Sequence, residues 1–237
     1  GIVYDSQAQS EYAECCLKAN FLTKTSVPFQ LIETMLWRPD QGYAFLRLHL
    51  ARLRNSARYF DFFYNQEKIL SALNSLERNF KQKAYKVRLL LDKDGRIGLG
   101  AALLNTVKDN HFRVCLAKHR TNSSDVFLYH KTTNRKSYDE IYSRCRRLGY
   151  YDIIFTNEKG EVTEGAVSNI FVRKNDRWFT PPLACGLLNG VYRKYLFTQR
   201  KLPVEEKILY KKDLFVANEI YLSNSVRGLV KVHLINQ

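Results

Sequence analysis

The segment LRLHLARLRNSARYF, residues 46–60, restricts the possible folds of this chain more than any other stretch. Its apolar residues recur at helical spacing and predict an amphipathic helix with one buried stripe. That stripe consists of Leu46, Leu50, Leu53, Ala57 and Phe60. The residues before it, 26–46, read as a strand, a turn at 39–42 and a second strand. A helix with one apolar face must pack on a neighbouring element, so we expect an α/β (α+β) fold.

The arginines of this predicted helix divide between two flanks of the stripe. At about 100° per residue, three of them gather on one flank, namely Arg47, Arg54 and Arg58. Arg52 projects alone on the other flank, beside His49 and Ser56. Arg52 is therefore unlike the other arginines of the helix and becomes a candidate functional residue.

The remaining elements alternate between helices and strands. The first half continues with a helix at 66–80 and a hairpin at 84–104 that turns at an Asp-Gly pair. In the second half we expect a helix from Ser137, as N-cap, to Gly149. Strands are expected at 112–118, 151–157 and 165–174, a helix after the turn at 189–193, and a strand–turn–strand at 219–232.

These elements predict two α/β lobes with a site between them. The polar stretch at 118–125 is the expected boundary. The predicted organisation is a tail over residues 1–24, a first lobe over 25–118 and a second lobe over 119–237.

Composition excludes several classes of protein. The formal charge of +15 is spread along the chain, and there is no zinc-finger or RNP pattern, so a basic surface that favours an anionic substrate is preferred over nucleic-acid binding. The five cysteines form no CxxC pair, which argues against a disulfide framework and against a metal site. No apolar run approaches the roughly 20 residues of a membrane span, and no export signal is visible. We expect a cytoplasmic protein without membrane contact.

The usual catalytic motifs are missing, namely GxSxG, HExxH, the P-loop and GxGxxG. Four features remain as candidates. They are Lys131 in HKTTNR, the carboxylate of Glu164 in VTEGAVSN, the isolated Arg52, and the turn NGVYR at 189–193. A desolvated lysine is a good amine nucleophile. Pyridoxal phosphate also needs an acid beside its pyridine nitrogen, and its phosphate is typically held by an arginine and a helix N-terminus. Taken singly, each of these features also fits a solvated loop or an ordinary helix cap.

The order of five motifs along the chain resembles the fold-type IV pyridoxal-phosphate enzymes. These motifs are HLARL, HKTTNR, EVTEGAVSNIFV, GLLNGVYR and EIYLSNSVRGLVKV. The family comprises branched-chain aminotransferases, D-amino-acid aminotransferases and 4-amino-4-deoxychorismate lyases. HKTTNR is most similar to the lyases. The resemblance implies a two-lobed fold like that of D-amino-acid aminotransferase, pyridoxal phosphate as cofactor, and a homodimer.

The resemblance also implies a role for each matched residue. Lys131 matches the catalytic lysine that holds the cofactor covalently, and Glu164 matches the partner of the pyridine nitrogen. The residues that match phosphate contacts are Arg52, the backbone of Val191 and Tyr192, and the hydroxyl of Ser225. Asn169 is expected near the cofactor ring. For the carboxylates of the substrate, charge alone suggests Arg135, Arg193 and Arg227, and Thr34 is a possible proton-relay hydroxyl, although a plain strand threonine fits as well.

The function implied is a lyase that converts 4-amino-4-deoxychorismate to 4-aminobenzoate and pyruvate in folate biosynthesis. An aminotransferase of the same fold, or a degenerate domain without catalysis, remains an alternative. Residues 1–24 resemble the C-terminal tail of the chorismate-binding synthases. We therefore expect a covalent or associated aminodeoxychorismate synthase component, with an ordinary N-terminal helix as the other interpretation.

Overall fold

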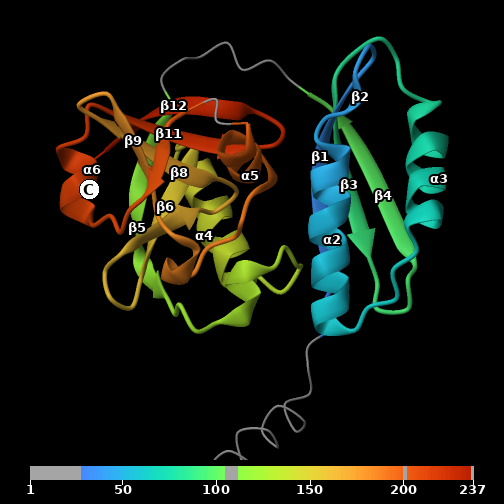
Figure 1. The fold of residues 1–237 in the computed structure, drawn as a ribbon, viewed down its shortest axis with the longest axis horizontal. Coiled ribbons are helices and arrows are strands. Elements are labelled where there is room, and N and C mark those ends of the chain that lie inside the picture. The colour runs from blue at the N-terminus through green and yellow to red at the C-terminus, as the bar shows by residue number, and fades with distance from the viewer. Residues whose placement is uncertain (1–27, 105–111, 200–201, 236–237) are drawn as a thin grey trace, which may run out of the picture.

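The computed structural model describes residues 28–104, 112–199 and 202–235. It has two lobes, which lie side by side in Figure 1. The tail expected at residues 1–24 lies outside the described residues. The mixture of helices and sheets agrees with the expected α+β class. Among the described helices, none combines the length and the apolar character that crossing a membrane requires.

The first lobe is an antiparallel sheet with two helices on one face. Its strands follow the order β2-β1-β3-β4. Their bounds are β1 Leu31–Arg38, β2 Gly42–Tyr43, β3 Tyr85–Leu91 and β4 Ile97–Leu103. The helices are α2 Leu46–Phe60 and α3 Gln66–Glu77. The hairpin β3–β4 turns at Gly95, whose φ of +85° is in the region that favours glycine.

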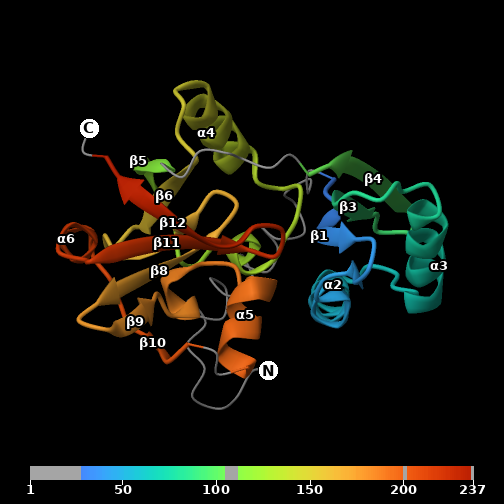
Figure 2. The same ribbon diagram turned by 90° about the horizontal axis from the view of Figure 1, so that it is seen from above.

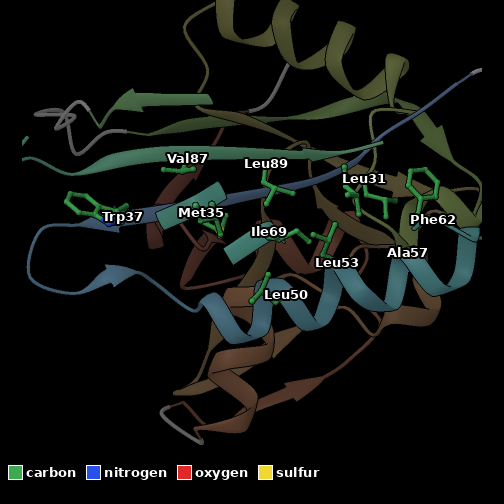
Figure 3. Close-up of a cluster of buried hydrophobic side chains, with 12 residues drawn as sticks. Leu31, Met35, Trp37, Leu50, Leu53, Ala57, Phe62, Ile69, Val87 and Leu89 are labelled. Atoms are coloured by element: carbon green, nitrogen blue, oxygen red, sulfur yellow. The ribbon is translucent and has the colours of Figure 1, made fainter. Parts of the chain in front are cut away.

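The buried stripe of α2 forms the core of this lobe, as its spacing predicts. Leu50, Leu53 and Ala57 are buried against sheet residues such as Met35 and Leu89 (Figure 3). The flank prediction is also confirmed, because Arg47, Arg54 and Arg58 are exposed whereas Arg52 is only 15% exposed. The sequence pattern therefore positions Arg52 toward the interior of the protein.

The second lobe is built on a sheet that closes on itself. Its order is β10-β9-β8-β11-β12-β5-β6-β7, and an additional pairing of β7 with β8 closes a barrel. Closure leaves those strands without a free edge. The strands are β5 Arg113–Thr121, β6 Asp152–Asn157, β7 Val162–Gly165, β8 Asn169–Lys174, β9 Arg177–Thr180, β10 Val204–Glu206, β11 Glu219–Asn224 and β12 Gly228–Leu234.

Short helices surround this barrel. They are η1 Val126–Tyr129, α4 Lys136–Arg147, η2 Leu183–Cys185, α5 Val191–Thr198 and α6 Lys211–Phe215. Seen from above, α5 faces α2 of the first lobe (Figure 2), and the two helices are in contact. The start of α5 is thereby brought close to Arg52.

Three expectations from the sequence differ from the structure. The first sheet ends at Leu103 and the second begins at Arg113, so the change of lobe precedes the expected boundary at residue 118. The reason is that β5 continues through the polar residues 119–121 and pairs there with β6. Helix α4 begins at Lys136 with Arg135 as N-cap, so Ser137 lies in its first turn and is not the cap. The strand expected at 165–174 begins only at Asn169, because the preceding loop turns inward to bind Asp152.

Candidate active site

Lys131 lies on an extended segment between η1 and α4. Its carbonyl oxygen accepts a hydrogen bond from the N–H of Ile32 at 2.9 Å. Thr132 forms an antiparallel bridge with Leu31 at the start of β1. The backbone groups of this segment are thus satisfied by a strand of the other lobe and not by a helical turn. Lys131 is fixed where the two lobes meet.

The environment of Lys131 favours the neutral amine. Burial lowers the pKa of Lys131 from its ordinary 10.5 to about 7, and the positive charges of Arg135 and Arg52 act in the same direction. Glu33 and Glu164 oppose the shift. A large fraction of the amine is therefore unprotonated at neutral pH. A lysine in that state can act as a nucleophile or as a base.

Glu164 on β7 is a buried carboxyl group that the protein keeps neutral. It is 8% exposed. Burial raises the pKa of Glu164 from 4.5 to about 8, although the N–H of Leu188 donates to its Oε2 at 3.2 Å and acts to lower it. Asn169 is adjacent, with Nδ2 3.4 Å from Glu164 Oε2 and 2.8 Å from the carbonyl oxygen of Leu188. A neutral acid of this kind can become the charged partner of a cationic ring nitrogen.

We expect the substitution Glu164→Gln to raise the melting temperature of the cofactor-free protein at alkaline pH. Between pH 4.5 and about 8, the folded protein keeps a proton on Glu164 that the unfolded chain has released, so the stability of the wild type falls as pH rises. The glutamine variant lacks this loss. Its advantage should grow through that window to about 10 °C or more, since each pH unit there changes the stability by about 1.4 kcal/mol and 1 kcal/mol shifts Tm by about 2–4 °C in a chain of this size.

Melting curves at pH 5, 6.5 and 8.5 test this expectation. Glu140→Gln, at an exposed position on α4, is the matched control and should show no pH-dependent difference. A constant offset between Glu164→Gln and wild type at the three pH values would contradict the raised pKa of Glu164.

Arg52 and the start of α5 form a positive pocket wall. Nη1 of Arg52 is 3.4 Å from the carbonyl oxygen of Asn189, in the turn before the helix. Gly190 is the N-cap, and no side chain caps the helix. The first N–H groups of a helix have no acceptor within the helix and favour an anion. Val191 lines the cavity here, whereas the Tyr192 ring packs on Phe45.

One cavity of about 1040 Å³ collects the predicted site residues from both lobes. It is lined by Lys131, Glu164, Arg52, Val191, Asn169 and Ser225, as well as by Thr34, Arg135 and Arg227. The hydroxyl of Ser225 donates to the carbonyl oxygen of Thr34 at 2.9 Å, so its proton is already used across the lobe interface. The Tyr192 side chain is not part of the cavity lining, but the prediction for Tyr192 concerns its backbone N–H alone.

Arg193 does not belong to this site, contrary to the expectation from its charge. Its guanidinium is buried inside the second lobe, donates to the carbonyl oxygen of Pro181 at 3.1 Å and pairs with Glu206. It also stacks on Phe197 at 4.9 Å. Arg193 therefore links α5 to Pro181 and Glu206 of the second lobe and does not face the cavity.

Asp152 is a structural residue of the site that the sequence analysis missed. It is fully buried, and its carboxylate accepts hydrogen bonds from Ile153 N–H at 2.8 Å and Ala166 N–H at 2.9 Å. The Ser168 hydroxyl donates to it at 2.5 Å. These bonds hold the loop between Glu164 and Asn169. No local signal in YDIIFTN distinguishes this aspartate from an ordinary strand start.

The sequence analysis also missed Glu33 and His49, although the position of Glu33 on its strand could have indicated a buried charge. Glu33 shares strand parity with the buried Leu31 and Met35, so an acidic residue stands where β1 needs an apolar one. The structure shows why, because the Glu33 carboxylate binds Nε of Arg52 at 2.8 Å and Nδ1 of His49 at 2.6 Å. A charged residue on the buried face of a strand predicts a buried partner.

Comparison with known proteins shows which proteins this chain is similar to. The family model for class IV aminotransferases matches residues 30–235. A Schizosaccharomyces pombe protein named "Putative aminodeoxychorismate lyase" is 29% identical over 212 residues, which is 87% of this chain and 90% of that protein. A Thermotoga maritima protein named as a probable branched-chain-amino-acid aminotransferase is 33% identical over 102 residues, 42% of this chain and 37% of that protein.

Solved structures show the same architecture. An aminotransferase structure from Mesorhizobium loti, described as "Putative amino-acid aminotransferase", has a TM-score of 0.82 at 32% identity and covers 87% of this chain and 100% of that one. A structure from Legionella pneumophila, described as "Putative 4-amino-4-deoxychorismate lyase", has a TM-score of 0.75 at 23% identity and covers 88% and 83%. At 23% identity, the second similarity establishes the fold alone.

Proposed function

This chain belongs to the class IV aminotransferase family, a family of fold-type IV enzymes that use pyridoxal phosphate, and we propose that it is a lyase that converts 4-amino-4-deoxychorismate to 4-aminobenzoate and pyruvate. The observation that carries the proposal is that Lys131, with a pKa of about 7, and the buried Glu164 line the same cavity. The lyase chemistry is favoured over that of the branched-chain enzymes by the similarity to the S. pombe protein, which extends over nearly the whole of both chains, whereas that to the Thermotoga maritima enzyme is partial. The M. loti structure, described as an amino-acid aminotransferase, is similar over an equal length, so an aminotransferase is the second candidate.

The residues of the cavity fit pyridoxal phosphate. Lys131 would bind the aldehyde carbon of the cofactor, and Glu164 would pair with the pyridine nitrogen. The raised pKa of Glu164 fits this role, because its proton can be transferred to a basic ring nitrogen. Arg52 and the N–H groups at the start of α5, at Val191 and Tyr192, would hold the phosphate. The Ser225 hydroxyl would bind the phosphate only by turning its proton away from the Thr34 carbonyl oxygen, and Asn169 would lie beside the ring.

The cofactor, when bound, supplies an electron sink for the carbon that carries the substrate amine. Once the amine of the substrate has replaced that of Lys131 on the aldehyde carbon, the freed Lys131 amine would remove the proton from C4 of the substrate ring, a task for which a pKa near 7 is suited. Lys131 then returns a proton to the departing enolpyruvyl group, which leaves as pyruvate. Loss of that group makes the ring aromatic, and the gain in aromatic stability drives the step.

The charge of the cavity supports an anionic substrate. Arg135 and Arg227 line it, and Lys86 and Arg88 reach it from the outer face of the first sheet. The proposed substrate carries two carboxylates, which such a lining would attract. The carboxylate contacts themselves are part of the proposal, with Arg135 and Arg227 as candidates and Thr34 as a nearby hydroxyl.

Product analysis separates the lyase from an aminotransferase of the same fold. With pyridoxal phosphate and 4-amino-4-deoxychorismate, we expect 4-aminobenzoate and pyruvate to form in equal amounts. The first is measured by its fluorescence and the second with lactate dehydrogenase. A parallel reaction with a branched-chain amino acid and 2-oxoglutarate should form no glutamate. Glutamate without 4-aminobenzoate would establish the aminotransferase, and a protein that stays colourless with pyridoxal phosphate would indicate a domain without catalysis.

We further propose a homodimer, as in the family resemblance, and a synthase component that supplies the substrate, on the basis of residues 1–24. A cytoplasmic location is proposed because the described cysteines Cys115, Cys145 and Cys185 are free thiols. Sedimentation of the purified protein and its co-purification with a synthase domain test the first two proposals.

A further inference from the structure

A closed network of polar side chains lies inside the first lobe, behind Arg52. Glu33 on β1 is 2% exposed, and His49 on α2 is fully buried. His49 and Arg52 are three residues apart on α2 and therefore lie on the same side of the helix. Both reach the same carboxylate, with Nδ1 of His49 2.6 Å from Oε2 of Glu33 and Nη2 of Arg52 also 2.6 Å from that oxygen.

The protonation states within the network are set by its contacts. Burial acts to raise the pKa of Glu33, but the charge of Arg52 and the hydrogen bonds from His49 and Arg52 outweigh it and bring the pKa to about 2. Burial lowers the pKa of His49, which favours the neutral imidazole, and because a carboxylate can only accept, Nδ1 of His49 is the donor to Glu33. Both carboxylate oxygens are therefore engaged, and the group cannot rotate.

The contacts of Arg52 with Glu33 fix the plane of its guanidinium. Nε binds Oε1 of Glu33 at 2.8 Å while Nη2 binds Oε2, which is a side-on bidentate pair. The remaining nitrogen, Nη1, points to the carbonyl oxygen of Asn189 at the start of α5. The free edge of Arg52 is thus turned toward the helix N-terminus where an anion would bind.

We propose that Glu33 and His49 are positioning residues, which hold the guanidinium of Arg52 in the orientation that binds the phosphate of the cofactor. This inference rests on the cofactor-binding part of the proposed function and not on the lyase reaction. A buried ion pair contributes little net stability by itself. Its effect here is geometric, because it leaves Arg52 one direction in which to present its remaining N–H groups.

The substitution Glu33→Gln tests the proposal by comparing two ligands. Glutamine keeps the shape of the side chain but removes the charge that orients Arg52. We expect the Kd for pyridoxal phosphate to rise about tenfold or more, as the loss of a supporting partner does at metal sites. The Kd for pyridoxal, which has no phosphate, should stay within about twofold of wild type. Absorbance titrations of the cofactor-free protein measure both constants.

Two controls show whether the effect passes through Arg52. Glu219→Gln removes a carboxylate of equally low pKa, about 2, which pairs with Arg173 and Lys231 outside the cavity. It should change neither constant. In an Arg52→Gln background, adding Glu33→Gln should weaken the binding of pyridoxal phosphate no further, because the orienting group has nothing left to orient.

An affinity for pyridoxal phosphate that is unchanged or higher in Glu33→Gln would overturn the proposal, as would an equal loss of affinity for both ligands. If that variant does not fold, His49→Asn and His49→Leu replace it as an isosteric pair. The asparagine amide can still donate to Glu33 and should retain the preference for the phosphate, whereas leucine should lose it. Equal preference in the two variants would also overturn the proposal. Wild-type protein that binds cofactor but makes no 4-aminobenzoate would contradict the lyase and leave this inference intact.

Discussion

Replacing Lys131 with alanine is expected to reduce turnover by about 10³-fold or more, because in the proposed reaction one amine serves both as the attachment point of the cofactor and as the proton carrier. The fold should be retained, since the bridge of this segment to β1 uses the Lys131 carbonyl and Thr132 and not the lysine side chain. Product formation in single-turnover and steady-state assays measures the loss.

A chemical test locates the reactive amine independently of activity. Borohydride reduction of the wild type with bound pyridoxal phosphate should add the cofactor mass to the peptide that contains Lys131, and the alanine variant should show no such peptide. Lys136→Ala is the matched control, five residues further along, where the side chain is 90% exposed. Near-wild-type turnover in Lys131→Ala would refute the catalytic assignment.

Gly190→Ala should have the second largest effect, through the phosphate end of the site. A Cβ at Gly190 would overlap the side-chain oxygen of Asn169, whose amide holds the carbonyl oxygen of Leu188. Either Asn169 or the start of α5 must move. Since displacements of about 1 Å in a site lower activity by about 10²-fold, we expect a Kd for pyridoxal phosphate raised by a similar factor.

The control for this substitution is Gly100→Ala on β4, where an added Cβ meets no atom within 4 Å. It should bind the cofactor as the wild type does. A cofactor affinity of Gly190→Ala equal to that of Gly100→Ala would show that α5 and Asn169 adapt without loss, and that the start of this helix does not bind the phosphate.

Local pattern was sufficient to predict much of the first lobe. Helix α2 and the β3–β4 hairpin follow from the spacing of apolar residues and from the turn at Gly95, which are local signals. The isolation of Arg52 could be predicted because one turn of helix fixes which residues share a flank. Its location in the cavity agrees with the prediction, as does that of Lys131, Glu164 and Asn169. Their roles remain predictions.

What the sequence did not indicate depends on contacts between residues distant along the chain. The extended conformation of Lys131 comes from its pairing with Ile32, about a hundred positions earlier, and no local pattern reports such a partner. The inward loop before Asn169 depends on Asp152, and the fate of Arg193 depends on Glu206. Charge alone could not separate Arg193 from the arginines that line the cavity, because that choice is made by packing.

The bridge between Leu31 and Thr132 also limits how this molecule can move. The lysine segment makes two sets of hydrogen bonds with the first lobe. The Lys131 carbonyl oxygen accepts from Ile32 on β1, and Thr133 bonds with Gln30 just before that strand. A hinge motion that separated the lobes would break these hydrogen bonds and remove the support that β1 gives to the lysine segment. A small molecule that exchanges without such a motion would pass through the mouth of the cavity. Exchange of small molecules would then follow the rapid motion of side chains and not the slower motion of whole lobes.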